Sequence, residues 1–256
     1  MEAHEFGKEN KEKILLIPGN IMSWRQFEDV IPHLEKKYHV IAISTDGYDG
    51  TGETTFTTAQ ASALTVENWF TKKGYDHIRL VFGESFGCAT ATAMFQNQNI
   101  SIDSMIVSGP QCIDYGILNG FFGSYVAKYQ YKLLRKMKST SKVPWLLNTF
   151  THSDEENMLK MFRAAADHVT LETIQNCDKE ALRLFGDIAA FEKRPDAKVG
   201  IWYGEKEPNM KKALKILKKI YPASEDHPFA GFGHGDIIGH PELMAQEIES
   251  FLSGGL

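Results

Sequence analysis

The pentapeptide GESFG at residues 83–87 constrains the fold of this chain more than any other feature. A mostly apolar run at 78–82 precedes it, and a run of small residues at 88–94 follows it. This order predicts a strand, a tight turn and a helix, with Ser85 at the apex of the turn. Glycine suits both ends of such a turn, because a side chain there would collide with the neighbouring strand or helix. The turn would present the Ser85 hydroxyl beside the first backbone N–H groups of the helix.

A serine hydroxyl is a weak nucleophile at neutral pH, so it needs a histidine as base and a carboxylate that orients the histidine. The chain has nine histidines, and His234 differs from the others in its setting, GFGHGD at 231–236. Glycines on both sides suit a loop that brings an imidazole close to other backbone. We therefore expect His234 to be the base.

The carboxylate is expected between the serine and the histidine in the chain. A strand-like run at 199–203 ends in GEKEP at 204–208, so Glu205 and Glu207 both remain candidates. The usual spacing of an acid in the loop after such a strand is G-x-x-D, which favours Glu207. Glu205 is the second choice.

With these motifs the chain resembles the α/β-hydrolase fold superfamily over nearly its whole length. The segment ILLIPGN at 14–20 is similar to the family's first core strand and oxyanion loop, although Pro18 stands where the family usually has histidine. The resemblance implies that the backbone N–H groups of Asn20 and Phe86 form an oxyanion hole. Asn20 also resembles the halide-binding asparagine of haloalkane dehalogenases, but those enzymes need an aspartate where this chain has Ser85.

Alternating apolar and amphipathic segments predict an α/β fold with a doubly wound, mostly parallel sheet. Residues 1–111 and 196–256 would form the core, and residues 112–195, where the alternation stops, would form an inserted helical cap. Strands are expected near 13–17, 39–44, 78–83, 104–109, 198–203 and 226–231. Helices are expected near 23–37, 58–73, 86–97, 208–220 and 241–252.

The resemblance implies a carboxylesterase-like serine hydrolase that cleaves a small carboxylic ester through an acyl-enzyme. One alternative keeps the same three side chains but hydrolyses a carbon–carbon bond or performs a lyase step. The menaquinone-pathway synthase has the acid motif G-E-x-D, which is similar to GEKE at 204–207. A second alternative is a non-catalytic hydrolase-fold protein that binds a small ligand.

Composition sets further expectations. The 256 residues carry a net charge of −5. No apolar segment is long enough to span a membrane, and the N-terminus has no apolar signal core. We expect a cytoplasmic protein with a small-molecule ester or acyl substrate, no nucleic-acid partner and no stable membrane insertion. The three cysteines show no metal-ligand spacing, and the triad chemistry requires neither a metal nor an organic cofactor.

Overall fold

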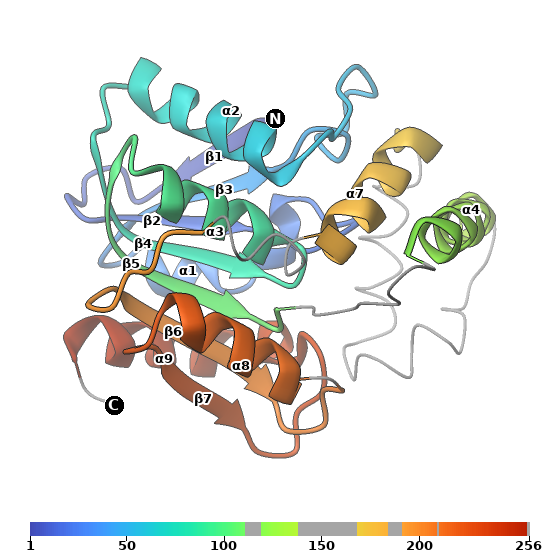
Figure 1. Cartoon of the computed structure of the whole chain (residues 1–256). Helices are drawn as coiled ribbons and strands as arrows, with labels where there is room; N and C mark the ends of the chain where they lie inside the picture. The colour runs from blue at the N-terminus through green and yellow to red at the C-terminus, as the bar shows by residue number, and fades with distance from the viewer. Residues whose placement is uncertain (111–118, 138–167, 184–190, 209, 255–256) are drawn as a thin grey trace.

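The computed structural model of the chain describes residues 1–110, 119–137, 168–183, 191–208 and 210–254 (Figure 1). Its centre is a seven-stranded sheet in the order β1-β3-β2-β4-β5-β6-β7. The six strands from β2 to β7 are parallel, and β1 pairs antiparallel with β3 at one edge. Helices cover both faces of the sheet, so the predicted doubly wound α/β fold is confirmed.

The strands are β1 (Glu2–Phe6), β2 (Lys13–Ile17), β3 (His39–Ser44), β4 (His77–Glu84), β5 (Ser101–Ser108), β6 (Lys198–Gly204) and β7 (Glu225–Phe229). The α-helices are α1 (Ile31–Leu34), α2 (Ala59–Lys72), α3 (Gly87–Asn97), α4 (Asn119–Met137), α7 (Leu171–Arg183), α8 (Met210–Ile220) and α9 (Pro241–Ser253). Short 3-10 helices are η1 (Trp24–Phe27) and η4 (Asp236–Gly239). All six predicted strands are present, and their ends differ from the predicted ones by at most three residues.

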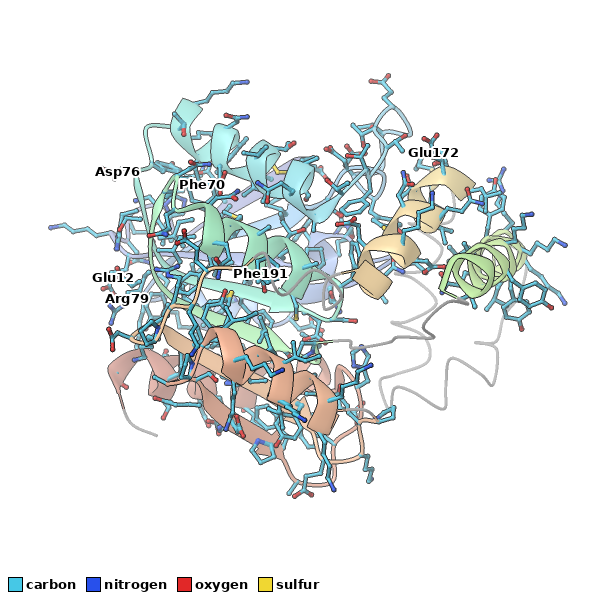
Figure 2. The ribbon with its side chains drawn as sticks, in the orientation of Figure 1. Glu12, Phe70, Asp76, Arg79, Glu172 and Phe191 are labelled. Atoms are coloured by element: carbon cyan, nitrogen blue, oxygen red, sulfur yellow. The ribbon has the colours of Figure 1, made fainter. Side chains whose placement is uncertain are left out.

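Side chains of the core strands alternate between two apolar layers. In β2, Leu15 and Ile17 face the layer that contains residues of α2, α3 and α8. Ile14 and Leu16 face the opposite layer, with residues of α1 and α9. Phe70, on α2, represents the first layer (Figure 2). Because helices cover both faces, both sets of strand side chains are apolar, and the sheet is a firm support for the loops at its ends.

The single helix predicted over residues 23–37 was wrong. The structure has η1 at 24–27 and the four-residue α1 at 31–34 instead. Pro32 lies in the first turn of α1, where a proline is tolerated. In the interior of one helix over 23–37 it would lack an N–H donor and its ring would clash with the preceding turn. Phe27 and Leu34 are nevertheless buried in the core, which explains the helical apolar pattern.

β1 was missed in the sequence because its residues, EAHEF, show no apolar run. The strand is an edge strand whose side chains are exposed or half-buried, so its pairing depends on the free edge of β3. Glu2 pairs with Ser44 and Phe6 with Val40. The residues of β1 therefore pair with residues 34 to 42 positions away, which no local pattern reveals.

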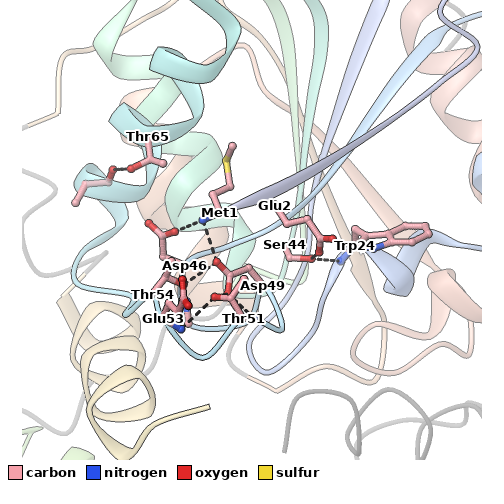
Figure 3. A network of polar contacts seen from close by, with 12 residues as sticks. Met1, Glu2, Trp24, Ser44, Asp46, Asp49, Thr51, Glu53, Thr54 and Thr65 are labelled. Atoms are coloured by element: carbon pink, nitrogen blue, oxygen red, sulfur yellow. Dashed lines mark hydrogen bonds and ion pairs between the residues drawn. The ribbon is translucent and has the colours of Figure 1, made fainter. Parts of the chain in front are cut away.

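Asp46 and Asp49, the two aspartates of the turn after β3, belong to a local polar network (Figure 3). Asp49 accepts hydrogen bonds from the hydroxyls of Thr51 and Thr54, each at 2.8 Å, and both aspartates form ion pairs with the Met1 amino group. Within the described residues, no group of three or more His, Cys, Asp or Glu side chains could hold a metal ion. The two aspartates therefore serve to brace this turn.

Phe82→Ala tests the packing of the sheet against the layer that contains α1 and α9. Phe82 is fully buried, and its ring meets Phe27 and Trp202 at centroid distances of 6.0 and 5.8 Å. The cavity should lower the free energy of unfolding by about 3–5 kcal/mol. Leu64→Ala is the control, because Leu64 is 42% exposed and should lower it by less than about 1 kcal/mol. Urea denaturation of both variants measures the difference, and equal losses would contradict this account.

Candidate active site

The loops that carry the candidate residues leave the same edge of the sheet. The loop at 18–20 follows β2, Ser85 follows β4, Glu207 follows β6, and His234 follows β7. The carboxyl ends of parallel strands lie along one edge, which is where open α/β sheets bind ligands. β2 and β4 are neighbours at the point where the strand order reverses, and Ser85 directly follows β4 there.

The turn between β4 and α3 holds Ser85 in a left-handed backbone conformation with φ of +49°. The Ser85 N–H donates to the carbonyl of Ser108 on β5 at 2.7 Å, which ties the turn to the sheet. A Cβ atom on Gly83 would lie 2.7 Å from the carbonyl oxygen of Gly87, and one on Gly87 would collide with the carbonyl of Ile17. The two glycines are therefore required by close approach of backbone, as the sequence predicted.

A continuous chain of hydrogen bonds joins the three predicted side chains. His234 Nε2 lies 2.9 Å from Ser85 Oγ, and His234 Nδ1 lies 2.9 Å from Glu207 Oε2. The other oxygen of Glu207 accepts a hydrogen bond from the Gly204 N–H at 2.9 Å. The Glu207 side chain is only 2% exposed, against 21% for His234, so the carboxylate is held from behind while the imidazole remains reachable.

Glu205, the second candidate acid, lies elsewhere. Its carboxylate accepts a hydrogen bond from the Gly231 N–H at 3.2 Å, on the exposed side of the loop. The structure therefore brings Glu207, and not Glu205, to His234. The side chain of Glu207 is one methylene longer than that of an aspartate. Glu207 lies in a turn in which its N–H donates to the Gly204 carbonyl, and this turn accommodates the extra length.

The loop after β2 lies against the nucleophile turn and is held by side chains. A Cβ atom on Gly19 would lie 3.4 Å from Ser85 Cβ. The Gly19 N–H donates to Gln26 Oε1 at 2.8 Å, and Asn20 Oδ1 accepts a hydrogen bond from the Tyr48 hydroxyl at 2.7 Å. The hydrogen bond from Tyr48 fixes the side chain of Asn20, the residue that directly follows Gly19.

Phe86, the second residue expected to donate to an oxyanion, directly precedes α3. An N–H at this position has no acceptor within the helix. The Phe86 ring meets Phe56 at 5.0 Å, within an apolar cluster that includes Ala127 of α4 and Ile174 of α7. Both helices belong to the predicted cap at 112–195, but residues 111–118, 138–167 and 184–190 lie outside the described part. The cap stays a prediction.

The model of the alpha/beta hydrolase fold family matches residues 13–241 of the chain. The chain belongs to the alpha/beta hydrolase fold family. The match begins at β2 and ends at the first residue of α9, so it includes every candidate residue of this site. No curated protein matches this alpha/beta hydrolase in sequence.

Solved structures share the fold at low identity. An alpha/beta hydrolase family protein from Desulfitobacterium hafniense is 19% identical, with a TM-score of 0.80 over 98% of this chain and 100% of its own. MenH from S. aureus is 17% identical, with a TM-score of 0.74 over 99% and 98%. A thermophilic esterase from Thermogutta terrifontis is 14% identical, with a TM-score of 0.69 over 99% and 93%. These likenesses establish the architecture of this hydrolase.

The electrostatics of the site raise the pKa of His234. Burial by itself lowers the pKa of His234, but the hydrogen bond that His234 donates to Glu207 and the negative charges of Glu84, Glu207 and Asp236 outweigh it, and the pKa is raised above its ordinary value. An imidazole with a raised pKa is a stronger base once it is deprotonated. The arrangement can therefore accept a proton from Ser85 Oγ and stabilise the resulting charge.

Sequence reasoning missed three residues that shape the site. Tyr48 binds the side chain of Asn20, Glu84 is a buried carboxyl beside the nucleophile, and Gly109 makes room for the imidazole. Glu84 was visible as a charged residue at the end of an apolar strand. Nothing in the local sequence marked the other two, because their partners lie far away along the chain.

Gly109→Ala tests whether the position of the imidazole controls the reactivity of Ser85. The residue has φ of +58°, and a Cβ atom on it would lie 2.8 Å from His234 Nδ1 and 3.3 Å from Glu207 Oε2. The imidazole would have to move, which should slow the reaction of Ser85 with a fluorophosphonate about 100-fold.

Gly50→Ala is the matched control for this substitution. Gly50 has φ of +74°, but its Cβ would meet no atom within 4 Å. Both variants should lose about 1–2 kcal/mol of stability through backbone strain, while only Gly109→Ala should lose reactivity. Unchanged labelling of Gly109→Ala would show that the site tolerates the displacement.

Proposed function

We propose that this alpha/beta hydrolase cleaves a small carboxylic ester through an acyl-enzyme on Ser85. The observation that carries the proposal is the unbroken hydrogen-bond chain from Ser85 Oγ through His234 to Glu207, with both distances at 2.9 Å. Nucleophile, base and orienting acid are thus in contact before any substrate binds. The comparisons support hydrolase activity in general and not a particular substrate. The family model is that of the alpha/beta hydrolase fold, and the similar structures include an esterase.

In the first half of the proposed reaction, Ser85 Oγ attacks the acyl carbon while His234 Nε2 takes the hydroxyl proton. Negative charge develops on the former carbonyl oxygen, and the N–H groups of Asn20 and Phe86 stabilise it. Each such donor is worth about 3 kcal/mol of transition-state stabilisation. The carbon–oxygen bond to the alcohol then breaks, and His234 delivers its proton to the leaving oxygen.

In the second half, water attacks the acyl carbon and His234 takes one of its protons. The Ser85–acyl bond breaks, the proton returns to Ser85 Oγ, and the carboxylic acid leaves. Throughout, Glu207 accepts a hydrogen bond from Nδ1–H, which keeps Nε2 free to act as the base and stabilises the imidazolium. All proton transfers are thus assigned to His234, and the proposed reaction needs no metal or organic cofactor.

The proposal is tested by fluorophosphonate labelling of the wild-type protein beside Ser85→Ala and His234→Ala. Initial rates on p-nitrophenyl esters from acetate to decanoate then give the chain-length preference. Labelling should disappear in Ser85→Ala and fall by at least about 1,000-fold in His234→Ala, together with turnover. Absence of both labelling and turnover in the wild-type protein would overturn the esterase function and favour a ligand-binding protein.

Glu207→Gln and Glu205→Gln test the assignment of the acid. Glutamine at 207 keeps the size of the side chain but cannot stabilise the imidazolium, so kcat should fall by about 10³–10⁴-fold. Glutamine at 205 should leave kcat within about twofold, because Glu205 only meets a backbone N–H on the exposed side of the loop. The reverse result would reassign the acid to Glu205.

A second candidate function is hydrolysis of a carbon–carbon bond or a lyase step at the same site. The similarity of the structure to MenH and the sequence GEKE at 204–207 favour it. Turnover of a vinylogous diketone, with no acyl-enzyme detected by rapid-quench mass spectrometry, would select this reaction over ester hydrolysis.

Two expectations from the sequence stay predictions. The substrate is proposed to be a small-molecule ester or acyl compound, without a nucleic-acid partner or stable membrane insertion, and the location is proposed to be cytoplasmic. None of the helices in the described part of the chain has the length and apolar character that crossing a membrane requires.

A further inference from the structure

Glu84 is a buried carboxyl group that the proposed reaction does not use. It is the last residue of β4, directly before Ser85, and it is 1% exposed. Within the described residues, neither of its carboxyl oxygens has a partner at full hydrogen-bond geometry, although the Ser108 side chain is close enough to lower its pKa. An unpartnered carboxylate in the core disfavours folding, so a purely structural role would be better served by an apolar side chain of the same size.

The surroundings of Glu84 place it among the groups of the site. Oε1 of Glu84 lies 3.5 Å from the position that a Cβ atom on Gly235 would occupy, next to His234 in the chain. Across the sheet, Glu84 pairs with Ser108, whose carbonyl holds the nucleophile turn. The carboxyl group therefore lies between the nucleophile turn and the loop that carries the base.

Titratable groups from three neighbouring elements bear on Glu84 or His234. The loop after β7 contributes His234 and Asp236, the loop after β6 contributes Glu207, and α3 contributes Cys88. Two of these four groups are carboxyls and one is a thiol, so His234 is the cation-forming member of the set. A negative charge on Glu84 can be balanced within this set only by His234.

We propose that Glu84 is a second acid of the site, a positioning residue that acts through His234 by charge and without a hydrogen bond. Both imidazole nitrogens already have partners, Nδ1 with Glu207 and Nε2 with Ser85. What Glu84 adds is a second negative charge in a site shielded from water, where Coulomb interactions are stronger than at the surface. The inference rests on the proposed function, in which His234 becomes positively charged during both halves of the reaction.

The protonation behaviour of both groups agrees with this role. Burial raises the pKa of Glu84 to about 7, with the nearby Glu207 raising it further and His234 and the Ser108 hydroxyl opposing the rise. The charge of Glu84 in turn raises the pKa of His234. Glu84 therefore exerts its effect above about pH 7, where it is ionised.

Titration of His234 by NMR tests the proposal without any substrate. The imidazole resonance is assigned by its loss in His234→Ala and is followed against pH in wild type, Glu84→Gln and Glu205→Gln. In Glu84→Gln the midpoint should move down by about one pH unit, a tenfold change in proton affinity. Glu205→Gln makes the same chemical change on the exposed side of a neighbouring loop and should move it by less than about 0.2 unit.

The outcomes separate this proposal from the proposed function. An unchanged midpoint in Glu84→Gln overturns the role of Glu84, whether or not the wild-type protein turns over esters. A lowered midpoint with no turnover supports the role of Glu84 and overturns the ester reaction alone. With turnover, the acid limb of kcat/KM should move to lower pH by the same amount as the NMR midpoint, and kcat on its plateau should fall about tenfold.

Thermal unfolding distinguishes a functional group from a structural one. The raised pKa of Glu84 in the folded state means that its contribution to stability is fully present below the unfolded value of about 4.5 and is lost as pH rises through about 7. Glu84→Gln and Glu84→Met should therefore unfold at a higher temperature relative to wild type at pH 8 than at pH 5. Lower melting temperatures at both pH values, with no change in the His234 midpoint, would assign Glu84 to the core.

Discussion

The close approach of the backbone at Gly87 to the end of β2 is the constraint on which the rest of the site depends. No side chain at this position can fit against the Ile17 carbonyl, so α3 begins directly beside the loop that follows β2. The same loop brings Gly19 close to Ser85, since a Cβ atom on Gly19 would lie 3.4 Å from Ser85 Cβ. The left-handed backbone conformation of Ser85 is strained. The hydrogen bond from the Ser85 N–H to the Ser108 carbonyl helps to hold the residue in it.

A second set of close contacts joins the far side of the site. Any Cβ atom on Gly204 would collide with the carbonyls of Phe232 and Gly233, so the loops after β6 and β7 lie against one another. Backbone hydrogen bonds between these loops, such as that from the Lys206 N–H to the Phe232 carbonyl at 2.9 Å, fix their relative position. The backbone contacts between these two loops therefore fix the hydrogen bond between Glu207 and His234. In the proposed reaction, the substrate would not have to order the acid.

Glu84 illustrates how a functional site departs from the rules that stabilise the rest of a core. The core strands place apolar side chains in both layers, and these side chains need no hydrogen-bond partners when they are buried. At the end of β4 the same burial holds a carboxyl group whose oxygens have no partner at full hydrogen-bond geometry within the described residues. Such a group is costly for folding, and the proposed role through His234 gives a physical reason for its presence.

The sequence alone determined where six of the seven strands lie along the chain, the turn around Ser85 and the glycine-rich setting of His234, because apolar runs and glycines act over a few neighbouring residues. It narrowed the acid to two glutamates, but only the tertiary structure decided that Glu207 meets His234, since that contact depends on two loops 27 residues apart. The edge pairing of β1, the support of Asn20 by Tyr48, 28 residues away, and the unpartnered burial of Glu84 were decided in the same way. Such contacts arise from packing between segments that are distant in the sequence, so no local sequence pattern predicts them.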